Sequence, residues 1–150
     1  NFSWPDWSMN GNQIILQYFK VEKDPTKVQR HLAIFELTTQ NFTTLHSLDN
    51  LHPFQPHPSP TRDEFLFVSL VSLELGGTDI FRTNTDGTGV TRLTNNKRSW
   101  LADWSSDGDK IIYKFTTENR IQTMRIMNRD GTNDYQLIIA GEEYGRGPNW

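Results

Sequence analysis

A short motif recurs along this chain at nearly constant spacing, and this repetition constrains the fold more than any other feature. The motif reads Asp-Trp-Ser-Met-Asn-Gly-Asn at residues 6–12 and Asp-Trp-Ser-Ser-Asp-Gly-Asp at residues 103–109, with a diverged copy at residues 57–63. The copies lie 51, 46 and 46 residues apart when they are aligned on Trp7, Pro58, Trp104 and Trp150. A period of this size is typical of repeat architectures, in which one supersecondary unit is stacked several times.

Each repeat contains four short apolar runs separated by polar turns. The turns at residues 10–12 and 107–109 carry Asn-Gly or Asp-Gly, which favour hairpins because glycine accepts a positive φ. The runs that follow, at residues 14–19, 65–71 and 110–115, are rich in β-branched and aromatic residues. Because no segment has a helical pattern, we expect strands and no helix.

Four-stranded antiparallel units at this period predict an all-β fold made of β-propeller blades. A β-sandwich is the alternative, but a sandwich would not need sequence repetition at this spacing. We expect a partial propeller, with blades at about 1–50, 51–96 and 97–142 and the first strand of a fourth at about 143–150. The residues to which we assign structural roles in the repeat are Trp7, Ser8, Gly11, Ser59, Asp86, Gly87, Trp104, Ser105, Asp107, Gly108, Asp130, Gly131 and Trp150.

Composition excludes several classes of protein. The formal net charge is −3 and the basic residues are scattered, which argues against nucleic-acid binding. The absence of cysteine excludes disulfides, thiolate metal sites and cysteine nucleophiles. No apolar run approaches the ~18 residues of a membrane span, so we expect no membrane insertion. Because the chain begins and ends within repeats, we expect it to be a fragment of a longer protein.

Three stretches resemble a known family: DWSSDGDKIIY at residues 103–113, MRIMNRDGTNDYQLI at 124–138 and DIFRTNTDGTGVTRLT at 79–94. They are similar to the repeats of TolB-like β-propellers, also called WD40-like or PD40 repeats. Ser106 and Met9 stand where that family usually has proline, and Pro58 stands where it has tryptophan. The resemblance implies a ring of six or seven blades in a periplasmic or secreted protein that binds other proteins at its disc face.

Two groups of residues are candidate metal ligands. Asp103, Asp107 and Asp109 surround one hairpin, and carboxylate oxygens at a turn can bind calcium. The alternative is that these side chains bond their own backbone, as Asp and Asn do in turns. His52 and His57 flank a proline-rich loop, and some propeller lyases hold a metal with channel histidines; the alternative is a rigid connection between blades. We expect no cofactor.

No catalytic motif is present: Gly-x-Ser-x-Gly, a glycine-rich phosphate loop and His-Glu-x-x-His are all absent. We therefore assign no catalytic residue and expect a non-catalytic protein-interaction scaffold, binding a partner through loops at the disc face. One alternative is the accessory propeller of a prolyl-oligopeptidase-type serine peptidase, and another is a polysaccharide lyase. The charged insert at residues 20–30 is a candidate contact loop, and open blade edges favour self-association.

Overall fold

The computed structural model describes residues 1–21, 28–72 and 76–137, and within these ranges the chain forms three four-stranded antiparallel sheets. Each sheet is a meander in which strands adjacent in sequence pair, and we call the sheets blades 1, 2 and 3. Their strands are β1 (Phe2–Trp7), β2 (Gln13–Val21), β3 (Val28–Glu36) and β4 (Phe42–Thr44); β5 (Pro53–Pro58), β6 (Glu64–Ser72), β7 (Gly77–Asn84) and β8 (Thr91–Arg92); and β9 (Ser99–Trp104), β10 (Lys110–Thr116), β11 (Gln122–Asn128) and β12 (Tyr135–Gln136). The all-β partial propeller is thus confirmed, while residues 143–150, with Trp150, lie outside the described residues.

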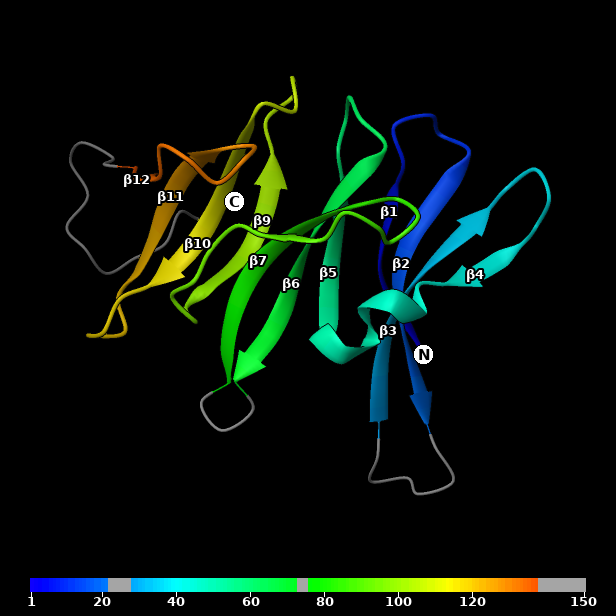
Figure 1. Ribbon diagram of the computed structural model, residues 1–150, viewed down its shortest axis with the longest axis horizontal. Helices are drawn as coiled ribbons and strands as arrows, with labels where there is room; N and C mark the ends of the chain where they lie inside the picture. The colour runs from blue at the N-terminus through cyan, green and yellow to red at the C-terminus, as the bar shows by residue number, and fades with distance from the viewer. Residues whose placement is uncertain (22–27, 73–75, 138–150) are drawn as a thin grey trace.

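The blades stand side by side (Figure 1), and a hydrophobic core fills each of the two interfaces between them. Strand β6 of the middle blade contributes to both cores. Phe65 and Phe67 belong to the core shared with blade 1, whereas Leu66 belongs to the core shared with blade 3, and all three are fully buried. Because both faces of β6 are buried, its sequence is a continuous apolar run rather than an alternating one.

The first strand of every blade contains a β-bulge at the same place. Trp4, Gln55 and Leu101 have φ values of +52°, +51° and +49°, and the pairing register shifts beside each of them. Two residues of the first strand there oppose one residue of the second strand, which bends the strand. The three side chains differ in chemical character. The backbone conformation therefore repeats at this position although the sequence does not.

The expectation of no helix is wrong at one place, where the 3₁₀-helix η1 (His46–Leu51) connects blade 1 to blade 2. Six residues are too few to produce a helical pattern in the sequence. Leu48 of η1 is fully buried in the core between these blades, which explains why the connection is ordered into a helix. Within the described ranges, no helix has the length and apolar character that crossing a bilayer requires.

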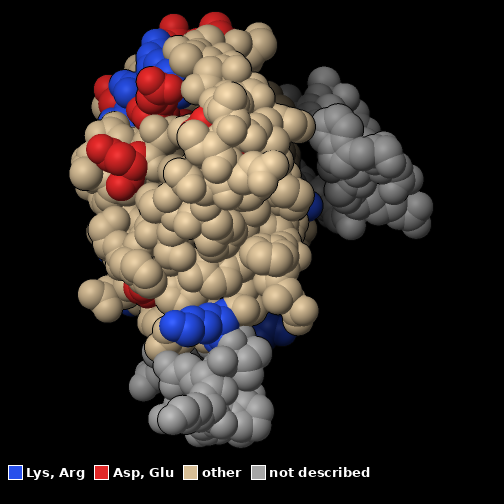
Figure 2. All heavy atoms as spheres, turned by 90° about the vertical axis from the view of Figure 1, so that its right-hand side faces the viewer, with Lys and Arg blue, Asp and Glu red and all other residues tan. Residues whose placement is uncertain are grey.

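The motif tryptophan contacts the preceding blade. Trp104 Nε1 donates a hydrogen bond of 2.9 Å to the carbonyl oxygen of His57 in blade 2, and Trp104 is only 9% exposed. Trp7 occupies the equivalent position in blade 1 and is 58% exposed. The same side of blade 1 carries other exposed apolar side chains, including Phe2 and Phe42. Figure 2 looks onto this side and shows a broad surface free of charge, with charged side chains gathered near its upper and lower edges.

This difference between two equivalent tryptophans can be measured. We expect Trp104→Ala to lower the free energy of unfolding by roughly 3–5 kcal/mol, because it removes a buried indole and its hydrogen bond. Trp7→Ala, at the equivalent exposed position, should change the free energy of unfolding of the monomer by no more than about 0.5 kcal/mol. Urea denaturation followed by circular dichroism measures both values. Equal losses for the two variants would contradict the assignment of Trp104 to the interface between blades.

Candidate functional site

One end of the molecule carries the turns that join the first and second strands of each blade; we call it the Asp-Gly end. At this end Asp107 accepts hydrogen bonds from the Ser105 hydroxyl at 2.5 Å and the Asp109 N–H at 3.0 Å. These two donors hold the pKa of Asp107 below its ordinary value. Asp109 instead pairs with Arg62 at 2.8 Å, and Asp103 accepts the N–H of Trp104 at 2.7 Å. The three carboxylates proposed as calcium ligands therefore each have separate protein partners.

The diverged turn of blade 2 contacts the regular turn of blade 3. Arg62, which replaces the motif glycine, donates from Nη1 to the carbonyl of Gly108 at 3.0 Å and from Nη2 to Asp109 at 2.8 Å. The Thr61 hydroxyl donates to the carbonyl of Asp107 at 3.2 Å. A Cβ at Gly108 would lie 2.4 Å from the Thr61 hydroxyl, so glycine is required there by space as well as by its φ of +71°. Loss of glycine in blade 2 thus creates a contact between blades.

A buried ion pair joins the same two blades. Glu64, at the start of β6, is 4% exposed and accepts two hydrogen bonds from Arg129, at 2.6 Å and 2.5 Å. Arg82 lies 3.6 Å from the same carboxylate and donates to the carbonyl of Arg129 at 3.2 Å. Hydrogen bonding to Glu64 raises the pKa of Arg129. The charged side chains in this part of the Asp-Gly end therefore form contacts between blades 2 and 3.

The opposite end carries an open hollow of about 390 Å³ between the ends of several strands of blades 2 and 3. Phe54 and Trp100 supply aromatic surface, Lys97 supplies positive charge, and Arg98 supplies a guanidinium that is paired with Glu118 at 3.3 Å. The Lys114 ammonium lies 5.2 Å from the centre of the Trp100 ring, which adds a third cation to this region. The hollow therefore combines aromatic surface with basic side chains, an arrangement suited to binding an acidic or aromatic segment.

The position of the basic residues depends on Asp79, which is fully buried in β7. Its carboxylate accepts hydrogen bonds from the backbone N–H groups of Asn96 and Lys97, at 3.1 Å and 3.0 Å, and from the Thr94 hydroxyl at 2.9 Å. Arg92 neutralises the carboxylate at 2.5 Å. Asp79 thus fixes the connection between blades 2 and 3 that carries Lys97 to the hollow. Its one signal in the sequence is an acidic residue directly before the apolar pair Ile80 and Phe81.

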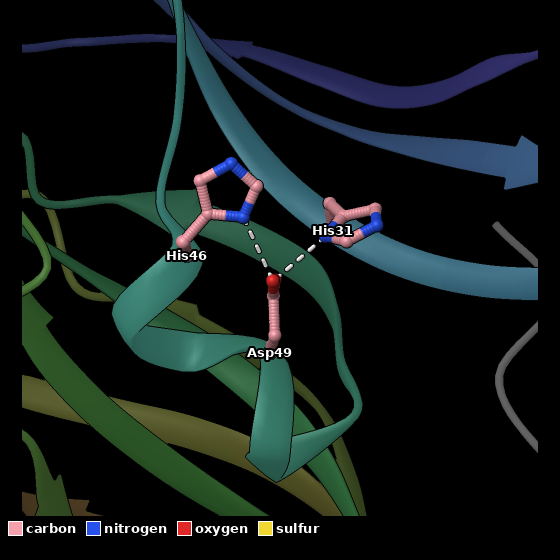
Figure 3. A group of neighbouring side chains, drawn as sticks. All are labelled: His31, His46 and Asp49. Carbon is pink, nitrogen blue, oxygen red and sulfur yellow. Dashed lines mark hydrogen bonds and ion pairs between the residues drawn. The ribbon is translucent and has the colours of Figure 1, made fainter.

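A second cluster lies between blade 1 and its connection to blade 2 (Figure 3). Asp49 of η1 accepts from His31 Nδ1 at 2.7 Å through one carboxylate oxygen and from His46 Nδ1 at 2.9 Å through the other. His31 comes from β3 and is 3% exposed, whereas the His46 side chain is 71% exposed. Among the described residues, these three form a group that could hold a metal ion. Sequence reasoning missed the group, although the spacing His46-x-x-Asp49 was available as a signal.

The histidines proposed from the sequence, His52 and His57, have other surroundings. His52 ends η1 with a left-handed φ of +46°, and its N–H donates to the Asp49 carbonyl at 3.1 Å. His57 Nδ1 lies 3.6 Å from an Asp6 carboxylate oxygen in blade 1. Neither belongs to the group among the described residues that could hold a metal ion. Most of the proposed contact loop at residues 20–30 lies outside the described residues.

No protein-family profile matches the chain. A curated protein, Protein slowmo homolog from Dictyostelium discoideum, is 28% identical over 111 residues, which are 68% of this chain and 45% of that protein. The solved structure of putative TolB from Agrobacterium tumefaciens matches with a TM-score of 0.74 at 20% identity, over 92% of this chain and 49% of that one. The β-propeller domain of the Trilobed protease from Pyrococcus furiosus matches with a TM-score of 0.68 at 14% identity, over 91% of this chain and 42% of that one.

At these identities the likeness to solved structures shows the fold alone, which is that of a TolB-type β-propeller. The chain spans about half the length of the TolB structure and less than half of the other two proteins.

The Glu64–Arg129 pair yields a prediction about stability. Arg129→Met should lower the free energy of unfolding by about 3 kcal/mol, because it leaves the buried Glu64 carboxylate without its main partner. The double variant Glu64→Leu with Arg129→Met should recover much of this loss, since it removes the buried charge as well. Urea unfolding of the two variants and of Arg120→Met, an exposed control, measures the effects. A double variant no more stable than Arg129→Met would contradict the prediction.

Proposed function

We propose that this chain is a non-catalytic protein-interaction scaffold of the TolB-like propeller type, and that a protein partner binds at the disc face that carries the hollow. The observation that carries the proposal is the hollow lined by Phe54, Trp100, Lys97 and Arg98. Aromatic and arginine side chains are enriched at the centres of protein interfaces, because they combine large contact area with hydrogen bonding. The partner would present an acidic segment with an apolar or aromatic anchor.

The division between the two ends of the blades supports this choice of surface. At the Asp-Gly end, Arg62, Glu64 and Arg129 are occupied by contacts between blades. At the opposite end, the hollow is open and its backbone is fixed by the buried carboxylate of Asp79. A preformed site of this kind loses little conformational entropy on binding. The TolB-like resemblance adds that the scaffold acts in the periplasm or in a secreted protein.

A peptide array tests the proposed surface. We expect the labelled chain to bind peptides in which Asp or Glu flank Trp, Phe or Leu, and binding should weaken as salt concentration rises. Fluorescence anisotropy with the best peptide should give at least a tenfold loss of affinity for Arg98→Glu and for Trp100→Ala. Arg120→Glu is the matched control, because this exposed arginine does not line the hollow. Unchanged affinity in both hollow variants, or no acidic peptide bound, would contradict the proposal.

Self-association through blade 1 is part of the same proposal. Trp7 and Phe2 are 58% and 70% exposed on the outer side of blade 1, where Figure 2 shows a broad area free of charge, and an apolar surface of this kind favours association. Light scattering of the purified chain should report a mass above that of the 17.4 kDa monomer. Trp7→Ser should shift the mass toward the monomer, whereas Ile121→Ser, an exposed apolar control on blade 3, should not. A wild-type chain that stays monomeric would contradict this part.

An accessory propeller of a prolyl-oligopeptidase-type serine peptidase is the second candidate function. The likeness to the propeller domain of the Trilobed protease favours it, at a TM-score of 0.68. In that case the blades would control access of substrate to a hydrolase domain elsewhere in the parent protein. Determining the parent coding sequence tests this candidate: an α/β-hydrolase domain with Gly-x-Ser-x-Gly would support it, and a parent protein with propeller blades alone would eliminate it.

A further inference from the structure

We propose that His31, His46 and Asp49 form a binding site for a divalent transition-metal ion at the connection between blades 1 and 2. The donor set is two imidazole nitrogens and one carboxylate, which suits Zn²⁺, Co²⁺, Ni²⁺ and Cu²⁺ better than Ca²⁺ or Mg²⁺. None of these three residues lines the hollow or belongs to the Asp-Gly turns, so the site uses side chains that the proposed partner binding does not use.

The ligand atoms already converge. They lie within 4.8 Å of one another, and the two His Nδ1 atoms are 2.7 Å and 2.9 Å from the Asp49 oxygens. Zinc bonds of about 2.0–2.2 Å place tetrahedral ligand atoms roughly 3.4 Å apart. The contacts therefore need to open by roughly half an ångström to admit an ion. His46 can make this movement because its side chain is 71% exposed.

The helix η1 and the strand β3 supply the three ligands and place them next to one another. His46 and Asp49 are three residues apart in η1, and side chains at this spacing in a 3₁₀-helix lie above one another. Figure 3 shows the Asp49 carboxylate between the His46 ring and the ring of His31, which comes from strand β3. The His31 ring stacks on Tyr18 with centroids 5.0 Å apart and an interplanar angle of 24°. His31 is thus a fixed ligand, and His46 is an adjustable one.

Proton positions are compatible with metal binding. Figure 3 marks a contact between Asp49 and each imidazole ring, and because a carboxylate can only accept, each Nδ1 carries the proton in the metal-free arrangement. In the metal-bound arrangement each neutral ring carries its proton on Nε2 and offers the Nδ1 lone pair. The Nε2 of His46 can donate to water because the ring is exposed. The Nε2 of His31 is buried without a hydrogen-bond partner among the described residues, so the metal-bound tautomer places an unsatisfied N–H there, and the free energy of metal binding has to offset this cost.

The surroundings leave room for further ligands. Asp49 and His46 have side-chain exposures of 29% and 71%, so water can complete the coordination of an ion held by three protein atoms. Binding would tie η1 to β3. Because Leu48 of η1 is fully buried between blades 1 and 2, the ion would also stabilise that interface.

Zinc and cobalt titrations of the purified, EDTA-treated chain test the site. We expect isothermal titration calorimetry with ZnCl₂ to give one ion per chain, and Co²⁺ to give visible d–d absorption. Zinc should also raise the thermal unfolding midpoint, and EDTA should reverse the rise. His46→Gln should weaken zinc binding at least tenfold, and it should fold normally because His46 is exposed. Asp49→Asn should weaken binding similarly.

The matched control is His52→Asn, on the same connection but outside the group. Asn accepts the left-handed φ of +46° found at this position. His52→Asn should bind zinc as tightly as the wild type does. Failure of the wild type to bind zinc at millimolar concentration, or equal affinities for wild type and His46→Gln with both folded by circular dichroism, would overturn the proposal.

Discussion

The whole structure depends on each blade burying its faces against neighbouring blades. A four-stranded sheet with apolar residues on both sides cannot remain in water alone, and β6 shows the solution, with Phe65 and Phe67 packed on one side and Leu66 on the other. The polar contacts follow from this packing. Trp104 can donate to the His57 carbonyl, and Arg129 can reach Glu64, only because the cores hold blades 2 and 3 at a fixed separation.

The direction of the strands then determines which turns and connections lie at each end of the blades. The turns between first and second strands gather at one end, where short Asp-Gly hairpins bring backbone carbonyls within reach of Arg62. The connections between blades reach the opposite end, where longer segments leave an open hollow. Loops at such ends commonly carry recognition while the sheets position them. One end therefore holds the blades together, and the other end remains available for binding.

Repetition in the sequence was sufficient to predict the blades, because it records backbone requirements that recur. Gly11 and Gly108 illustrate this: both have a positive φ, of +65° and +71°, so the glycine is visible in two copies of the motif. The bulges at Trp4, Gln55 and Leu101 could not be predicted, because their backbone shape is imposed by the sheet and leaves the side chains free to differ. The helix η1 is too short to leave a pattern.

The candidate site residues were harder to predict for a related reason. Asp79 acts through backbone N–H groups at Asn96 and Lys97, and the spacing between an acid and such groups carries no recognisable motif. The cluster of His31, His46 and Asp49 joins a strand to a connection that enters the next blade, so it belongs to no single repeat. The sequence favoured Asp103, Asp107 and Asp109 because they surround one hairpin, but Asp103 and Asp107 accept hydrogen bonds from that hairpin, and Asp109 pairs with Arg62 of blade 2.

The diverged turn of blade 2 has a consequence for the order of the blades. Arg62 and Thr61 fit a neighbour that presents an open glycine turn and an acidic residue, which blade 3 does with Gly108 and Asp109. Blade 2 carries no such glycine in its own turn, so it could not take the place of blade 3 beside a copy of itself. The blades are consequently not interchangeable modules. The order of the blades is determined by side-chain contacts between neighbours. If the repeats were placed in another order, these contacts would be lost although every individual sheet kept its fold.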